Sequence, residues 1–339
     1  MGRLILRIVI CIPVALGLLW AGAALWIDGP PSRVAAAALV ISMVITVASA
    51  LLLLSTFRRK LAGAALPFIV VLVWWLGLSP ANDRNWQSDV ARLPTASLDG
   101  SLLTINNVRS FRYSSIDDYE EAWITTTYDL DELVGFDIFF SFWGPQAYGH
   151  TIASWEFSDG RHLAVSIETR KEVGESYSAI RGFFRQFELY YVVAEETDVV
   201  ALRTNHRREQ VELYRVFTPD NGDRAMLLNY INEINALAAQ PRWYNALTQN
   251  CTTTIWDHAK AVGSRFPLDW RLLANGYVLE LAQELGTVNS DMPLATLRER
   301  SDITAKAQGL ESLDNFSAVI REGLPPRPTR FPARLTSSD

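Results

Sequence analysis

IVICIPVALGLLWAGAALWI, residues 8–27, decides the architecture of the chain because it is an uncharged apolar run of membrane-spanning length. An α-helix needs about 20 such residues to cross the hydrocarbon core of a bilayer. Two further uncharged runs, Val34–Phe57 and Leu61–Leu78, follow at once. The apolar part of a cleaved secretory signal is only about 7–15 residues long, and it is not followed by two more spans. The sequence therefore predicts three transmembrane helices within residues 1–80.

The basic residues of this segment predict its orientation. Arg3 and Arg7 precede the first helix, and the run Arg-Arg-Lys at 58–60 separates the second helix from the third. The other short loop, residues 28–33, carries one charge of each sign. Basic loops stay on the cytoplasmic side of a membrane. We therefore expect a cytoplasmic N-terminus, with everything after Pro80 on the opposite side.

Charge separates the two parts of the chain. The 339 residues have a net charge of −6, whereas the first 80 residues hold six bases and one acid, so the remainder has a net charge of −11. An acidic body argues against nucleic-acid binding, which needs a basic face. Cys11 and Cys251 are the two cysteines of the sequence, so a disulfide scaffold is excluded.

The exported part is predicted to be an α+β domain in which a sheet comes first and helices follow. We expect a polar linker at 81–99, the catalytic domain at 100–290, and a C-terminal extension at 291–339 that ends in a disordered tail from Pro325. Short runs rich in β-branched and aromatic residues predict strands at Leu102–Asn106, Ala122–Asp129, Phe136–Phe142, His150–Phe157, His162–Thr169, Glu188–Ala194 and Val211–Val216.

Helical patterns occupy the second half of this domain. Thr218 and Pro219 predict the start of a helix that runs to about Ala238. Two more helices are expected at Cys251–Ala261 and Tyr277–Leu285, and a short one at Ser178–Phe184.

Several common catalytic motifs are missing from the sequence. It contains no Walker A motif, no G-x-G-x-x-G after a strand, no H-E-x-x-H and no G-x-S-x-G. Its four histidines do not have the spacing of metal ligands. We therefore expect neither a metal nor a cofactor.

Cys251 is the strongest candidate for a reactive group. It lies in YNALTQNCTTT, residues 244–254, where a polar turn gives way to an amphipathic helix. The first turn of a helix stabilises a thiolate through its free N–H groups and the positive end of its dipole. A cysteine can instead serve as a small core residue, but the polar neighbours on both sides favour a nucleophile.

A thiol nucleophile needs a base within hydrogen-bonding distance. His258 is seven residues further along the same helix, about 10.5 Å along its axis, and is expected to be structural or exposed. His206 has charged neighbours typical of a surface. His150 follows the turn-prone residues 144–149 and opens a strand, so its ring can stand at a sheet edge. We predict His150 as the base, with a hydrogen-bonded core histidine as the alternative interpretation.

A third residue should orient the imidazole. If the hairpin turns about Asp159, then His150 faces Glu168, and Ser166 is its diagonal neighbour on the same face. Glu168 is therefore the preferred orienting residue and Ser166 the alternative. Both depend on the register, since a slip of one residue would reverse the faces.

These features together resemble known families. A histidine on an early strand, followed much later by Tyr-Asn-x-Leu-x-x-Asn-Cys at a helix start, resembles the circularly permuted papain-like (NlpC-type) fold. More closely, the segment 82–262 is similar to the Lnb N-terminal periplasmic domain family. That similarity rests on Asn82-Asp83-Arg84-Asn85-Trp86, the Trp143-Gly144…His150 strand, Ser166 to Glu172, Gly182-Phe183-Phe184-Arg185-Gln186 and Trp243 to Thr254.

The resemblance implies thiol-based N-acylation of bacterial lipoproteins, with Cys251 as the nucleophile and His150 as its base. It implies as partners the lipoprotein substrates, a phospholipid or lipoprotein acyl donor, and the inner membrane, with the main domain in the periplasm. Asn250, Tyr244 and Trp143 belong to the shared motifs and are expected to bind the substrate.

Two other functions are compatible with the same residues. The first is a papain-like amidase or peptidase that acts on cell-wall peptides, with water as the acceptor. The second is a membrane-anchored binding module without catalysis. For acyl transfer, the residues leave open the donor, the choice between transfer within and between molecules, and the second oxyanion donor beside the Cys251 N–H.

Overall fold

The computed structural model describes residues 2–145, 147–218, 221–263, 266–310 and 312–329. The chain divides into two compact units. The membrane unit consists of residues 1–81 and 177–188, and the sheet unit consists of residues 82–176 and 189–339. Each unit is described by itself.

Three long apolar helices form most of the membrane unit: α1 (Gly2–Ile27), α2 (Arg33–Leu53) and α3 (Phe57–Leu76). Each is long and apolar enough to cross a membrane. The side chains of Ser32 and Thr56 cap the N-termini of α2 and α3 by accepting hydrogen bonds from backbone N–H groups. The prediction of three apolar N-terminal helices is confirmed.

The segment Tyr177–Glu188 belongs to the membrane unit rather than to the sheet unit. Phe184 is buried in the cluster formed by α1 and α3 residues such as Ala21. The Arg185 guanidinium lies 4.3 Å from the Trp75 ring centroid, and the Arg185 backbone N–H donates to Asp28 Oδ2 at 3.2 Å. This segment contains a short 3₁₀-helix, Arg181–Phe183, within the range in which the sequence predicts a short helix. Its contacts fix it to the helices of its own unit.

One sheet forms the centre of the sheet unit, in the order β1-β2-β9-β8-β7-β6-β10, with β5 paired to β2. Its strands are β1 (Thr95–Asp99), β2 (Leu102–Arg109), β5 (Trp123–Asp129), β6 (Leu133–Phe142), β7 (His150–Phe157), β8 (His162–Arg170), β9 (Glu188–Ala194) and β10 (Gln210–Val216). A separate two-stranded ribbon pairs β3 (Arg112–Tyr113) with β4 (Tyr119–Glu120).

The hairpin β7–β8 has the register expected from its turn at Asp159. Ile152 pairs with Ser166, and Glu156 pairs with His162. Ser141 of β6 pairs with His150 on the other side of β7. The start of β7, the end of β6 and the end of β8 therefore lie together at one end of the sheet.

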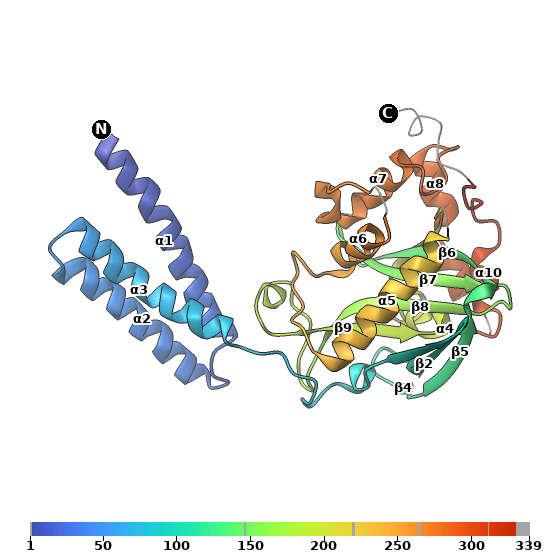
Figure 1. Cartoon of the computed structure of the whole chain (residues 1–339), viewed down its shortest axis with the longest axis horizontal. Coiled ribbons are helices and arrows are strands. Elements are labelled where there is room, and N and C mark those ends of the chain that lie inside the picture. Colours follow the sequence, from blue (N-terminus) through green and yellow to red (C-terminus); the bar gives the residue numbers. More distant parts are fainter. Residues whose placement is uncertain (1, 146, 219–220, 264–265, 311, 330–339) are drawn as a thin grey trace. The chain divides into compact units, whose positions relative to one another are not determined.

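Helices pack on both faces of this sheet. On one face, Trp155 of β7 meets Tyr230 of α5 (Gly222–Ala239) edge-to-face at 5.0 Å between ring centroids, and α5 crosses the strands in Figure 1. On the other face, Ile152 shares a buried cluster with Phe316 and Ile320. The helices are α4 (Glu196–Val199), α5 (Gly222–Ala239), α6 (Cys251–Ala261), α7 (Val278–Glu284), α8 (Leu294–Ser301), α9 (Thr304–Gln308) and α10 (Phe316–Arg321). The α+β class predicted from the sequence is confirmed.

Two predicted boundaries, those of the linker and of helix α5, need correction. The segment 81–99, expected to be a linker, contains buried Val90 and strand β1, and from Asn82 onward it is part of the sheet unit. Helix α5 begins at Gly222, with Asn221 at its N-cap, rather than at Thr218. Pro219 lies outside the described residues.

The predicted disordered tail also begins too early. Arg327 donates to Asp137 Oδ1 at 3.0 Å and to Glu156 Oε2 at 2.8 Å. Residues 330–339 of the predicted tail lie outside the described residues. The chain around Arg327 is held because that guanidinium pairs with two carboxylates of the sheet.

Candidate active site

Cys251 is the first residue of helix α6, and its position is fixed by a capping box. Asn250 Oδ1 accepts hydrogen bonds from the backbone N–H groups of Thr252 and Thr253, both at 2.9 Å. In return, the Asn250 N–H donates to Thr253 Oγ1 at 3.0 Å. This reciprocal pair defines the start of the helix. It places the thiol beside the first amides of the helix, which have no partner within the helix.

His150 is the first residue of β7 and is nine-tenths buried. The preceding Gly149 is needed because a Cβ atom there would lie 2.8 Å from the ring of Phe142 and 3.1 Å from the Ser141 carbonyl oxygen. The close approach of Gly149 to the end of β6 fixes the position at which the chain enters β7 with His150.

The fold brings His150 and Cys251 together. The two side chains lie close enough for each charge to shift the pKa of the other group. Thr151, the next residue of β7, also helps to lower the pKa of the thiol. The thiol therefore has a basic group beside it.

Two residues hold the imidazole on its other side. His150 Nε2 lies 2.6 Å from Ser166 Oγ and 3.3 Å from Glu168 Oε1. Ser166 Oγ in turn donates to Glu168 Oε1 at 2.8 Å. The two alternatives weighed from the sequence thus act on the ring together, with Ser166 as a bridge to the carboxylate.

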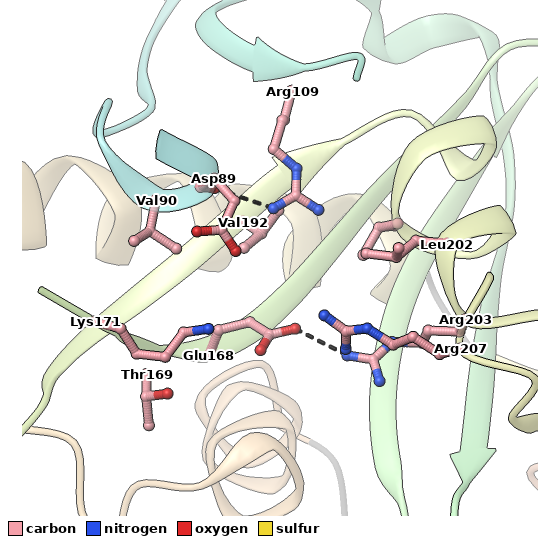
Figure 2. A pocket seen from close by; sticks show the side chains of 11 residues that line it. Asp89, Val90, Arg109, Glu168, Thr169, Lys171, Val192, Leu202, Arg203 and Arg207 are labelled. Atoms are coloured by element: carbon pink, nitrogen blue, oxygen red, sulfur yellow. Dashed lines mark hydrogen bonds and ion pairs between the residues drawn. The ribbon is translucent and has the colours of Figure 1, made fainter. Parts of the chain in front are cut away.

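Arg203 supports this carboxylate from behind. Its Nη2 donates to Glu168 Oε1 at 3.0 Å, and its Nη1 donates to Glu209 Oε2 at 3.0 Å. Figure 2 shows the Glu168 carboxylate directed at the Arg203 guanidinium, with Arg207 beside it. The cavity between these groups and Arg109 is about 30 Å³, which has room for only a few water molecules. It is a polar space behind the site and is too small for a substrate.

The charges of these groups shift the pKa of each partner. Burial raises the pKa of Cys251, but the charge of His150 and its hydrogen bond lower it more, so it falls from 9.0 to about 6. Burial and the charge of Arg203 lower the pKa of His150, whereas Glu168 and Cys251 raise it, and the net direction is upward. Burial raises the pKa of Glu168, but His150 lowers it well below the usual range. These directions favour a thiolate–imidazolium pair near neutral pH.

Asn275 is a site residue that the sequence analysis missed. Its Oδ1 accepts from the Gly149 N–H at 2.7 Å. Its Nδ2 donates to Thr252 Oγ1 at 2.9 Å and lies 4.0 Å from Cys251 Sγ. Asn275 therefore ties the start of the histidine strand to the start of the cysteine helix. It lies in a 3₁₀ turn, Asn275–Tyr277, and no motif in its vicinity marks it.

The three residues expected to bind substrate have different environments. The Asn250 amide is occupied on both sides, because its Nδ2 also donates to the Ala246 carbonyl at 2.9 Å, so it supports the helix cap rather than a ligand. Tyr244 is buried. Trp143 is 59% exposed in the loop that leads to His150, and of the three it has the surface available for contact.

His258 is buried away from the thiol chemistry. Its ring stacks on Tyr230 at 3.7 Å between centroids, and its nitrogens bond Tyr191 Oη at 2.8 Å and Asn229 Oδ1 at 2.6 Å. Burial lowers the pKa of His258 to about 3. The structural role expected for His258 fits these contacts, and the ring is neutral at physiological pH.

Comparison with known proteins adds one result. Residues 119–276 match the family model of the Lnb N-terminal periplasmic domain. The matched region includes His150, Ser166, Glu168, Cys251 and Asn275. No curated protein and no solved structure matches the chain.

The match confirms the resemblance drawn from the sequence, although the motif at residues 82–86 lies outside the matched region. The permuted papain-like topology stays a prediction. The chain is a membrane protein with three candidate spans, and its residues 119–276 are similar to the Lnb N-terminal periplasmic domain family.

Proposed function

We propose that this protein is a membrane-anchored cysteine acyltransferase that N-acylates bacterial lipoproteins. One observation carries the proposal: Cys251 lies beside a buried His150 whose ring is held by Ser166 and Glu168. A nucleophile next to a base, which is itself oriented by a third group, is the arrangement that covalent acyl transfer requires. The family match supports the same chemistry.

In the first half-reaction, the Cys251 thiolate attacks the carbonyl carbon of an acyl ester. The tetrahedral oxyanion is stabilised by the Cys251 N–H at the start of α6. When this intermediate collapses, the C–O bond breaks and a thioester remains on Cys251. The His150 imidazolium gives its proton to the leaving alkoxide, so an alcohol departs.

In the second half-reaction, the α-amino group of the lipoprotein's terminal cysteine attacks the thioester. His150, now neutral, accepts a proton from the attacking nitrogen. Collapse breaks the C–S bond, forms the amide and regenerates the thiolate–imidazolium pair. Glu168 and Ser166 keep the ring in place through both proton transfers.

A membrane anchor suits this substrate class for an energetic reason. Withdrawal of an acyl chain with about fifteen methylenes into water costs of order 12 kcal/mol, at ~0.8 kcal/mol for each CH₂. An enzyme held at the membrane surface avoids most of this cost, because the chain can stay in lipid. Phospholipid and diacylated lipoprotein both present the required ester, and either can serve as donor.

The proposed location is the bacterial inner membrane, with the N-terminus in the cytoplasm and the sheet unit in the periplasm. The partition of basic residues at 3, 7 and 58–60 supports it. An enzymatic reporter fused after Pro80 should be active only in the form that requires export. Activity of a cytoplasmic reporter at that position would reverse the orientation.

The function is tested with full-length protein reconstituted in liposomes that contain a diacylated lipoprotein with a free α-amino group. Mass spectrometry of the lipoprotein's N-terminal peptide should show an added amide-linked acyl chain. Cys251→Ala and Cys251→Ser should show none, because neither side chain supplies a thiolate. Cys11→Ala is the matched control and should behave as the wild type, since Cys11 lies in helix α1.

Two other outcomes have definite meanings. Full acylation by the Cys251→Ala protein would rule out the thiol mechanism. Release of free fatty acid without acylation of the amine would identify a hydrolase, with water as the acceptor.

A further inference from the structure

In the described part of the sheet unit, a set of large exposed apolar side chains lies in the loops that lead to His150, Cys251 and Asn275. We call this set the site rim, and define it as Trp143, Tyr148, Leu247, Leu268, Trp270 and Leu273. Leu268 is 81% exposed and Trp270 is 63% exposed. Residues of this size and exposure in one region are typical of an interaction surface.

The site rim is built from three loops, each of which leads into a residue of the candidate site. The first connects β6 to β7 and ends at His150, and the second precedes Cys251. The third precedes Asn275 and is joined to the first, because the Gly276 N–H donates to the Ala147 carbonyl at 3.2 Å. The same contacts that assemble the site therefore hold the rim around it.

The composition of the rim differs from that of the exposed apolar residues elsewhere in the sheet unit. Its members include two tryptophans and a tyrosine, the residue types that favour the membrane–water interface. The other large hydrophobic residues that are exposed in the described part of this unit are aliphatic: Leu98, Leu102, Ile116, Val134 and Val173. The rim thus has the chemistry of an interfacial surface.

The attachments of the sheet unit favour a membrane as the occupant of this surface. The chain passes from this unit to the membrane unit next to Asn82, Ser176 and Leu189. Arg170 is the last residue of β8, two positions after Glu168. Its Nη1 donates to Asn82 Oδ1 at 3.2 Å, and its guanidinium lies 5.5 Å from the ring of Tyr190. The Glu175 N–H donates to the Glu172 carbonyl at 2.9 Å, next to Ser176.

All three attachments therefore leave the sheet unit from the end of the sheet that carries His150. The chain continues from there into its own apolar helices, which makes a lipid bilayer the available partner for the rim.

We propose that the site rim docks into the surface of the lipid bilayer, with its aromatic and leucine side chains at the interface. Docking opens the site toward lipid, so that an acyl ester reaches Cys251 while its chain stays in the membrane. The docking itself is independent of the proposed function, whereas the delivery of an acyl ester rests on it.

The test uses full-length protein with one chain in each lipid nanodisc and an environment-sensitive fluorophore at a single cysteine. In a Cys11→Ala, Cys251→Ala background, Leu268→Cys places the fluorophore on the rim. Val134→Cys is the matched control, since Val134 is 52% exposed and lies near the start of β6, at the end of the sheet away from His150.

The fluorophore at position 268 should emit at a shorter wavelength and be strongly quenched by brominated lipid. The fluorophore at position 134 should retain its aqueous emission and resist that quencher. Aqueous emission at position 268 would overturn the proposal. A blue shift without quenching by lipid would also overturn it, because protein would then cover the rim. Since the background lacks the thiol, neither result depends on catalysis.

Discussion

Two buried histidines of the same unit, His150 and His258, have opposite ionisation behaviour. Both are at least nine-tenths buried and both bond a hydroxyl group. The pKa of His150 is raised, whereas the pKa of His258 falls to about 3. Burial alone lowers the pKa of a histidine, so the difference must come from the neighbours.

Those neighbours differ in charge. His150 faces the carboxylate of Glu168 and the thiol of Cys251. His258 faces the neutral groups of Tyr191, Tyr230 and Asn229, while the charge of Arg242 further lowers its pKa. A buried imidazole beside a carboxylate can carry a proton through a reaction, whereas one among neutral groups can only support packing. The comparison therefore separates a reactive from a structural histidine.

Replacement of His150 should have the largest effect on activity. His150→Gln removes the base and the positive charge that stabilises the thiolate, so kcat/KM for acyl transfer should fall by about 100- to 10,000-fold. The measurement is the rate of acylation of a lipoprotein peptide in liposomes. A loss of less than threefold would remove His150 from the mechanism.

Loss of the Glu168 charge should have a smaller effect with a distinct signature. Removal of a neighbouring charge shifts a pKa by about 1–3 units. In Glu168→Gln the pKa of His150 should fall and that of Cys251 should rise. The rate at pH 6 should then fall by about 10- to 100-fold, and should recover partly at higher pH as the thiol ionises.

A pH profile of kcat/KM for the wild type and Glu168→Gln proteins checks this prediction. A uniform loss across the pH range would assign Glu168 to the fold instead. Ser166→Ala serves as a companion variant that keeps the carboxylate but removes its bridge to the ring.

The smallest effect on activity is expected at His258. His258→Gln should leave kcat/KM nearly unchanged and lower the free energy of unfolding by about 1–3 kcal/mol, through loss of the stacked ring and its hydrogen bonds. Thermal denaturation in nanodiscs measures the second quantity. A loss of activity comparable with that of His150→Gln would make the two histidines equivalent and end the comparison.

The same variant tests the low pKa of His258. Below the ordinary histidine pKa of about 6.5 the unfolded chain binds a proton that the folded chain does not, so acid should destabilise the fold between about pH 6.5 and 3. His258→Gln should flatten this part of the stability curve. An unchanged slope would show that the ring titrates normally.

The sequence predicted the elements that have a clear local signal. Strands β7 and β9 and helix α6 have the predicted ends, because runs rich in β-branched and aromatic residues mark the strands and a polar turn marks the start of the helix. The pairing of His150 with Glu168 could be inferred because a hairpin register depends only on the position of its turn. The imidazole and its carboxylate could therefore be proposed together from the sequence.

Other parts of the fold and of the site have no comparable pattern in their own sequence. Strand β1 lies at the edge of the sheet and is largely exposed, so it shows no alternation and its segment resembled a linker. Asn275 and Arg203 reach the site only through tertiary folding, from a 3₁₀ turn and from a π-helical turn, Leu202–His206. The segment Tyr177–Glu188 packs with the membrane helices. Its local sequence does not predict that contact.

The ionisation of Cys251 tests the central claim most directly, namely that charged neighbours make this thiol a nucleophile. The rate of its alkylation by iodoacetamide is measured against pH in full-length Cys11→Ala protein, by mass spectrometry of the peptide that contains Cys251. Only the thiolate reacts, so the rate should rise with an inflection near pH 6. In His150→Gln the inflection should move toward the ordinary thiol pKa of 9.0. An inflection near pH 9 in the wild-type histidine background would contradict the account.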